Sequence, residues 1–218
     1  MARVMDPWIG SRYEHGGINK LKLLVLGESS YKREGYPESY DLSQHNRNLA
    51  LDAIGYEEGA RWWNASKFYT RITRMFGFDA RRREERQEFW NSVCFCNFLQ
   101  VILTGPRKSP SREAWQEATG PLLQTLQELR PDYLLSFSMR MWGYLPPRCG
   151  DVAIPNQEGV FARKAQIQLM DGTAVSVLGF QHPVGRGFTW RRVGVVLCRA
   201  LDIQDDMPQQ TTAINPES

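Results

Sequence analysis

The sequence predicts an α/β protein of three layers, in which a central, mainly parallel β-sheet lies between two layers of helices. Short apolar runs with little alternation, which are typical of strands buried on both faces, recur at 21–26, 93–96 and 175–180. Segments with apolar residues at helical spacing separate these runs. A chain of 218 residues, 42% of them hydrophobic, can also bury a sizeable core.

The first half of the chain begins with a predicted strand at 20–26, because its leucines and valine show no polar alternation. Two helices at 41–55 and 62–76, the second ending at Gly77, and a segment at 84–90 lead from it to a second strand at 93–96.

The second half continues the alternation of helices and strands. A helix is predicted to begin with Ser109 as its N-cap and Pro110 at its first position, and to continue over 113–129, where Pro131 prevents its extension. After it we expect a strand at 133–137, a hairpin of 165–170 and 173–178 across Asp171-Gly172, and a last helix at 191–201.

One domain is predicted over residues 1–204. A variable insert rich in Trp and Arg occupies about 32–86, and the polar tail at 205–218 is expected to be disordered. The net charge of +3 suits a nucleic-acid partner, although it suits many others. No apolar run reaches the roughly 20 residues of a membrane span, and the N-terminus has no signal-peptide pattern. We therefore expect a cytoplasmic protein, and we expect it to be a monomer.

Polar residues follow three of the apolar runs. Glu28 comes just after the first run, Asn97 directly follows the second, and His182 lies just beyond the third. In an open parallel sheet, ligands bind outside the carboxyl ends of the strands, so these side chains can converge on one pocket. A carboxylate, an amide and an imidazole that meet there would form a hydrolytic site.

Five short segments occur in a particular order along the chain. They read GESSY at 27–31, FCN at 95–97, SREAW at 111–115, PDYLLSFS at 131–138 and HPVGRGF at 182–188. This ordered set resembles the uracil-DNA glycosylase superfamily, over roughly 20–33 and 89–200. The resemblance implies a monofunctional DNA glycosylase, which flips a pyrimidine out of duplex DNA, hydrolyses its bond to deoxyribose and leaves an abasic site. No metal or other cofactor is expected, and no lysine occupies a motif position for a Schiff base.

The first motif departs from the pattern of the uracil-specific members. Members with G-Q-D-P-Y-H carry an aspartate where this chain has Ser29, whereas the G-E-x-P-G members also have a glutamate at the position of Glu28. The resemblance implies that Glu28 orients the attacking water and stabilises the developing sugar cation. Two alternatives stay open: a mechanism without a strong base, and a structural role in which Glu28 caps a helix or pairs with an arginine.

Asn97 and His182 would act on the base. An amide offers a donor and an acceptor together, which can match the Watson–Crick edge of a flipped pyrimidine. A neutral imidazole at His182 would donate a hydrogen bond to the departing base. The alternative for Asn97 is the role of a turn residue at the end of a strand.

Three further residues are assigned to the base pocket. Tyr31 falls where uracil-specific relatives place the tyrosine that walls off the 5-position of the base, and Ser29 lies beside it. Phe68 belongs to the insert, where it could instead be part of the core because it lies at helical spacing with Ile72 and Phe76.

DNA contacts are expected in turns with hydroxyls, glycines and cations, whose alternative role is that of ordinary surface turns. The candidates are Ser30, Lys108, Ser109, Ser111, Val184 and Arg186. Val184 or Arg186 would also replace the apolar wedge that relatives insert into the duplex. The six arginines between 71 and 86 are as consistent with a salt-bridged helix face as with DNA contacts.

Cysteines and the remaining histidines are assigned no chemistry. Some relatives hold an iron–sulfur cluster, but the four cysteines contain no C-x-x-C pair, so we predict buried, small apolar side chains. Cys94 and Cys96 should point to one face of the sheet. His15 and His45 are predicted to lie on the surface.

Substrate choice follows from the departures from the family. Because the aspartate is missing and the insert is large, we expect a modified pyrimidine, such as the hypermodified cytosine of phage DNA, in a role in anti-phage defence. The alternatives are uracil excision in base excision repair, a DNA-binding module with weak or no catalysis, and a hydrolase of free nucleosides or nucleotides.

Overall fold

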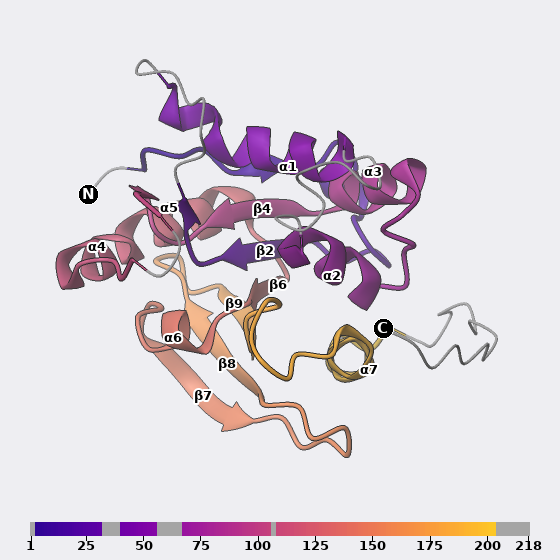
Figure 1. Cartoon of the computed structure of the whole chain (residues 1–218). Helices are drawn as coiled ribbons and strands as arrows, with labels where there is room; N and C mark the ends of the chain where they lie inside the picture. The colour runs from indigo at the N-terminus through magenta and orange to yellow at the C-terminus, as the bar shows by residue number, and fades with distance from the viewer. Residues whose placement is uncertain (1–2, 32–39, 56–66, 106–107, 204–218) are drawn as a thin grey trace.

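The computed structural model describes residues 3–31, 40–55, 67–105 and 108–203 (Figure 1). The predicted disorder at 205–218 lies outside these residues, as do Trp62, Trp63 and much of the insert.

A seven-stranded mixed sheet forms the middle of the protein, and its order is β1-β4-β2-β6-β9-β8-β7. The four central strands β4, β2, β6 and β9 are parallel, and β1, β8 and β7 add antiparallel edges. The bounds are β1 Trp8–Ile9, β2 Leu23–Gly27, β4 Cys94–Asn97, β6 Tyr133–Ser136, β7 Arg148–Ala153, β8 Ala162–Gln168 and β9 Ala174–Phe180. A separate two-stranded sheet pairs β3 Ser30–Tyr31 with β5 Ile102–Leu103 in parallel.

Helices cover both faces of the sheet and bury a hydrophobic core on each (Figure 1). One core is built with α1, α2, α3 and α7, and the other with α4, α5 and α6. The bounds are α1 His45–Gly55, α2 Lys67–Met75, α3 Arg83–Ser92, α4 Arg112–Glu117, α5 Thr119–Leu129, α6 Met139–Trp142 and α7 Trp190–Ala200, with 3-10 turns at Tyr13–His15 and Leu42–Gln44. The α/β class and the mainly parallel centre of the sheet are therefore confirmed.

Strand β2 explains why the sheet needs two helical layers. Leu23 and Val25 point into the first core, Leu24 and Leu26 point into the second, and all four are fully buried. Each such side chain contributes about 1.5–3 kcal/mol when it leaves water, so neither face of β2 can be left uncovered.

Several predicted elements differ in detail. The helix expected at 113–129 is divided into α4 and α5 at Ala118, and its N-cap is Ser111, whose Oγ accepts from the Ala114 N–H at 3.1 Å. Ser109 is therefore not the cap.

The predicted hairpin is confirmed, with β8 and β9 paired around the 169–173 turn, where Gly172 has a φ of 84°. The described part of the helix at 62–76 is α2, and the chain turns at Gly77, with a φ of 84°.

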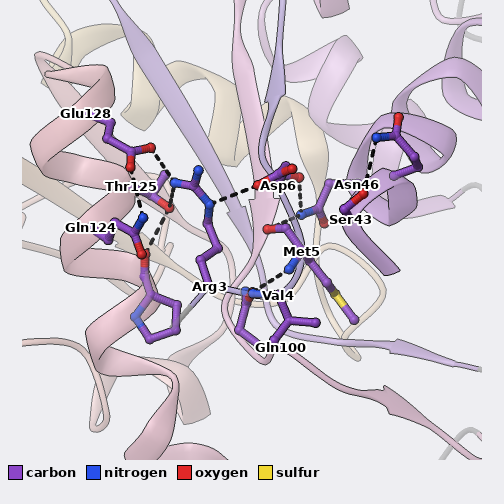
Figure 2. A network of polar contacts seen from close by, with 12 residues as sticks. Arg3, Val4, Met5, Asp6, Ser43, Asn46, Gln100, Gln124, Thr125 and Glu128 are labelled. Carbon is purple, nitrogen blue, oxygen red and sulfur yellow. Dashed lines mark hydrogen bonds and ion pairs between the residues drawn. The ribbon is translucent and has the colours of Figure 1, made fainter. Parts of the chain in front are cut away.

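The N-terminal segment 3–6 contacts two distant parts of the chain (Figure 2). The Gln100 side-chain oxygen accepts from the backbone N–H groups of Val4 and Met5, at 3.1 and 2.9 Å. Arg3 forms an ion pair with Glu128 of α5. The segment thereby connects α5 with the chain that leaves β4.

Three predictions about individual side chains are wrong. His45 is fully buried and its Nδ1 lies 3.0 Å from the Tyr40 hydroxyl, so it is no surface residue. Cys149 is exposed, whereas Cys94, Cys96 and Cys198 are buried as predicted. Arg86 fits neither a solvated face nor a DNA contact, because its side chain is buried and donates to three backbone carbonyls. Within the described ranges, no helix meets the length and apolar character that a membrane crossing requires.

Candidate functional site

The carboxyl ends of the central strands bring the three motif residues to one edge of the sheet. Gly27 at the end of β2 lies opposite Asn97 in the parallel register, and Ser136 of β6 lies opposite Gly179 of β9. Glu28, Asn97, Ser138 and His182 therefore all leave the sheet at the same edge, as parallel pairing requires.

Asn97 is 4% exposed and lies in a cluster of buried amides and hydroxyls. Its side-chain Nδ2 donates to Ser30 Oγ at 2.8 Å and to Asn46 Oδ1 at 3.2 Å. Its Oδ1 lies over Gly27, where a Cβ atom would come within 2.6 Å of it. A glycine at position 27 is therefore needed for Asn97 to keep this place.

Glu28 is 8% exposed and is held by Ser138 and Arg140. The Ser138 hydroxyl donates to Oε2 at 2.6 Å, and Arg140 donates through Nε to Oε2 at 3.2 Å and through Nη2 to Oε1. The structural alternative, an ion pair with an arginine, is thus present. The hydrogen bond to Glu28 also raises the pKa of Arg140.

Arg140 lies on α6 with half of its side chain exposed. Its guanidinium stacks 5.3 Å from the Trp115 ring of α4, and Trp115 in turn stacks on Tyr144 with ring centroids 4.7 Å apart. This arrangement holds the cation beside the Glu28 carboxylate.

His182 has a defined tautomer. Its Nδ1 accepts from the Val184 backbone N–H at 3.2 Å, so the neutral ring carries its proton on Nε2. Burial lowers the pKa of His182, and the charge of Arg140 lowers it further against the opposing effect of Glu28. The side chain is therefore a neutral donor through Nε2 at neutral pH.

Phe68 of α2 packs against this edge of the sheet. Its ring centroid lies 5.5 Å from that of His182, and 6.4 Å from those of Phe95 and Phe137. One turn later on the same helix, Arg71 donates to the Pro183 carbonyl. Helix α2 therefore fixes both the face of the histidine and the loop that carries it, and Phe68 is at once a core residue and a wall of the site.

The remaining predicted residues differ in how far they are buried. Ser30 is buried and its hydroxyl is used by Asn97, Ser29 is half-buried, and Tyr31 is 39% exposed. The other candidates for DNA contact are exposed: Lys108, Ser109, Ser111, Val184 and Arg186. Arg107 lies outside the described residues.

Asn46, Ser138, Arg140 and Arg71 were not identified as site residues from the sequence. Ser138 ends a segment that resembles the glycosylases, which is the only signal among them. The other three act through contacts between distant segments, and no spacing along the chain marks them.

A cavity of about 490 Å³ lies elsewhere, between α7 and strands β6, β7, β8 and β9. None of the predicted site residues lines it. Within the described parts of the chain, no group of three or more His, Cys, Asp or Glu side chains is arranged to hold a metal ion. Burial raises the pKa of Cys96 to about 12, and that of Cys94 is raised as well, so both remain thiols.

Comparison with known proteins finds no protein-family model and no curated protein that matches this chain. Its function is therefore inferred from the geometry at the carboxyl edge of the sheet and from the resemblance of the motifs.

Proposed function

We propose that this protein is a monofunctional DNA glycosylase, which flips a modified pyrimidine out of duplex DNA and hydrolyses its N-glycosidic bond. The observation that carries the proposal is the meeting of Glu28, Asn97, Phe68 and His182 at the edge where the parallel strands of the sheet end. The motif order that resembles the uracil-DNA glycosylases supports the same activity.

His182 would stabilise the departing base. The base leaves as an anion. A neutral imidazole with a proton on Nε2 can stabilise this anion by donating a hydrogen bond to the base carbonyl. The Val184 N–H keeps that proton on Nε2. The loss of such a donor costs about 10²–10³ in rate.

Glu28 would stabilise the developing sugar cation and bind the attacking water. A carboxylate has about four lone-pair positions. In the described residues three are used, two on Oε2 and one on Oε1, so Oε1 keeps one position for a water. A carboxylate held in this place can also stabilise the oxocarbenium-like sugar.

The modified base remains the preferred substrate in this proposal. Ser29 cannot act as a base near neutral pH, so efficient uracil excision is not expected. Hypermodified cytosine of phage DNA would be the target in a role in anti-phage defence. Phe68 and Tyr31 would face the base, with Val184 and Arg186 exposed on the loop after His182.

A DNA-binding module with little catalysis is a second candidate, and one observation favours it. The Glu28 carboxylate is bonded to Arg140 and Ser138, as expected of a structural ion pair. The two candidates differ in whether the protein makes abasic sites.

The test is mass spectrometry of the bases released from three matched duplexes, which carry uracil, 5-hydroxymethylcytosine or glucosylated 5-hydroxymethylcytosine. Alkali-labile strand breaks report the abasic sites. We expect faster release of a modified cytosine than of uracil, because a pocket shaped for a bulky substituent holds a small base loosely. A clear preference for uracil contradicts the substrate. DNA binding without any released base or alkali-labile site favours the binding module.

A further inference from the structure

Asn46 is a fully buried polar residue on α1 that belongs to none of the motifs. A buried amide needs hydrogen-bond partners, because an unmet donor or acceptor is costly away from water. Within the described residues, the hydrogen bonds of its side chain join two segments, the N-terminal segment at Met5–Asp6 and Asn97 at the end of β4.

The orientation of the Asn46 amide follows from backbone groups whose roles are unambiguous. Its Oδ1 lies 3.2 Å from the Asn97 backbone N–H, which can only donate. Its Nδ2 donates to the Asp6 carbonyl at 2.9 Å and to the Met5 carbonyl at 3.5 Å, and these can only accept (Figure 2). The oxygen of Asn46 therefore faces Asn97.

This fixes the amide of Asn97 in turn. The group of Asn97 that faces Asn46 Oδ1 at 3.2 Å must be the Nδ2 nitrogen, since two amide oxygens would repel each other. The second hydrogen of that nitrogen goes to Ser30 Oγ at 2.8 Å. Both donor positions of Asn97 are thus occupied inside the protein, and among the described residues nothing donates to its Oδ1.

A second buried amide reinforces the same arrangement from the backbone side. Gln100 donates from Nε2 to the Asn97 carbonyl at 3.2 Å, while its Oε1 accepts from Val4 and Met5. The N-terminal segment therefore holds Asn97 through Asn46 and through Gln100.

We infer that Asn46 is a positioning residue, which together with Ser30 makes Asn97 present its carbonyl oxygen alone and so selects a base that offers a donor at that point. On the Watson–Crick edge of a cytosine-type base this donor is the 4-amino group. The inference rests on the proposed glycosylase activity and narrows it, because Asn97 would read the base as an acceptor and not as a donor and acceptor together.

NMR of the Asn97 side-chain amide tests whether Asn46 fixes the orientation of Asn97, and this test requires no enzymatic activity. We expect slow hydrogen exchange of both Nδ2 protons in the wild type. Exchange should become at least about tenfold faster in Asn46→Leu, which removes the acceptor. In Asn46→Asp, which keeps an acceptor oxygen, exchange should be slower than in Asn46→Leu. Asn48→Leu is the matched control on the same helix, because Asn48 bonds to Tyr40 and not to Asn97. Rapid exchange in the wild type overturns the inference and needs no variant to fold.

Selection of the base by Asn97 is tested with two duplexes. One carries 5-hydroxymethylcytosine, and the other carries its analogue that lacks the 4-amino group. The wild type should favour the amino-bearing base in kcat/KM by roughly 10–100-fold beyond the difference in their uncatalysed rates, as expected for one lost hydrogen bond in a buried site. Asn46→Leu should lose most of this preference, and Asn48→Leu should keep it. An unchanged preference in Asn46→Leu overturns the inference. If the wild type releases no base at all, the proposed function fails, while amide exchange still decides whether Asn46 positions Asn97.

Discussion

Glu28 is held by an ion pair with Arg140 and a hydrogen bond from Ser138 at the carboxyl edge of the sheet. Arg140 and Ser138 occupy most of its lone pairs, and the carboxylate is 8% exposed. The residue types and their place after β2 were visible in the sequence. The identity of the partners was not, because Arg140 follows a different strand.

In the proposed glycosylase Glu28 would be a positioned acid–base group, which contributes about 10²–10⁴ in rate, so the exchange of Glu28 for glutamine should reduce base release by that factor. DNA affinity should change little. Single-turnover release and a binding titration measure the two effects. Glu158→Gln is the matched control, because Glu158 is also a mostly buried glutamate that pairs with an exposed arginine, Arg199 at 2.7 Å. Equal activity in both variants would move the carboxylate role away from Glu28.

The pKa of His182 leads to a prediction about pH. Burial places this pKa below the usual value of about 6.5, so the neutral donor form should persist on the acid side of that value. An NMR titration of the His182 ring checks this, and a midpoint at or above 6.5 would contradict it.

Stability should depend on the same group. Because the unfolded chain binds the proton more tightly, the stabilising contribution of neutral His182 is present above about pH 6.5 and is lost as the pH falls through the folded pKa. His182→Ala should lack this part of the pH dependence in urea unfolding.

Secondary structure could be predicted from the sequence where a segment is buried on both faces. Strands β2, β4, β6 and β9 are such segments, and their apolar runs mark them in any context. Strand β7 was missed because its residues are mostly exposed and it forms by pairing with β8. The short strands β1, β3 and β5 depend in the same way on their neighbours.

Packing between β9 and α6 depends on one glycine. A Cβ atom at Gly179 would lie 2.3 Å from the Trp142 ring, which is buried and cannot move freely. Gly179→Ala should therefore destabilise the protein by about 1–3 kcal/mol, as overpacking does. Urea denaturation measures this, with Gly55→Ala as the control because a Cβ there meets nothing within 4 Å. Equal stability of the two variants would show that α6 is not tightly packed on β9.

The parallel centre of the sheet brings the residues of the candidate site together. Residues far apart in the sequence meet because β2, β4, β6 and β9 all end at one edge. Topology of this kind was predictable from the apolar runs. The buried network of Asn46, Gln100 and the N-terminal segment was not, since it depends on side-chain contacts that no periodicity encodes.

The most direct test of an active site at the carboxyl edge of the sheet is single-turnover base release by Asn97→Ala and His182→Ala, on the best substrate of the wild type. Each variant should lose at least about 10² in rate, because in the proposed glycosylase Asn97 would contact the flipped base and His182 would stabilise its developing charge. Circular dichroism and DNA affinity should remain close to the wild type. If both variants release the base at the wild-type rate, the carboxyl edge of the sheet is not the active site.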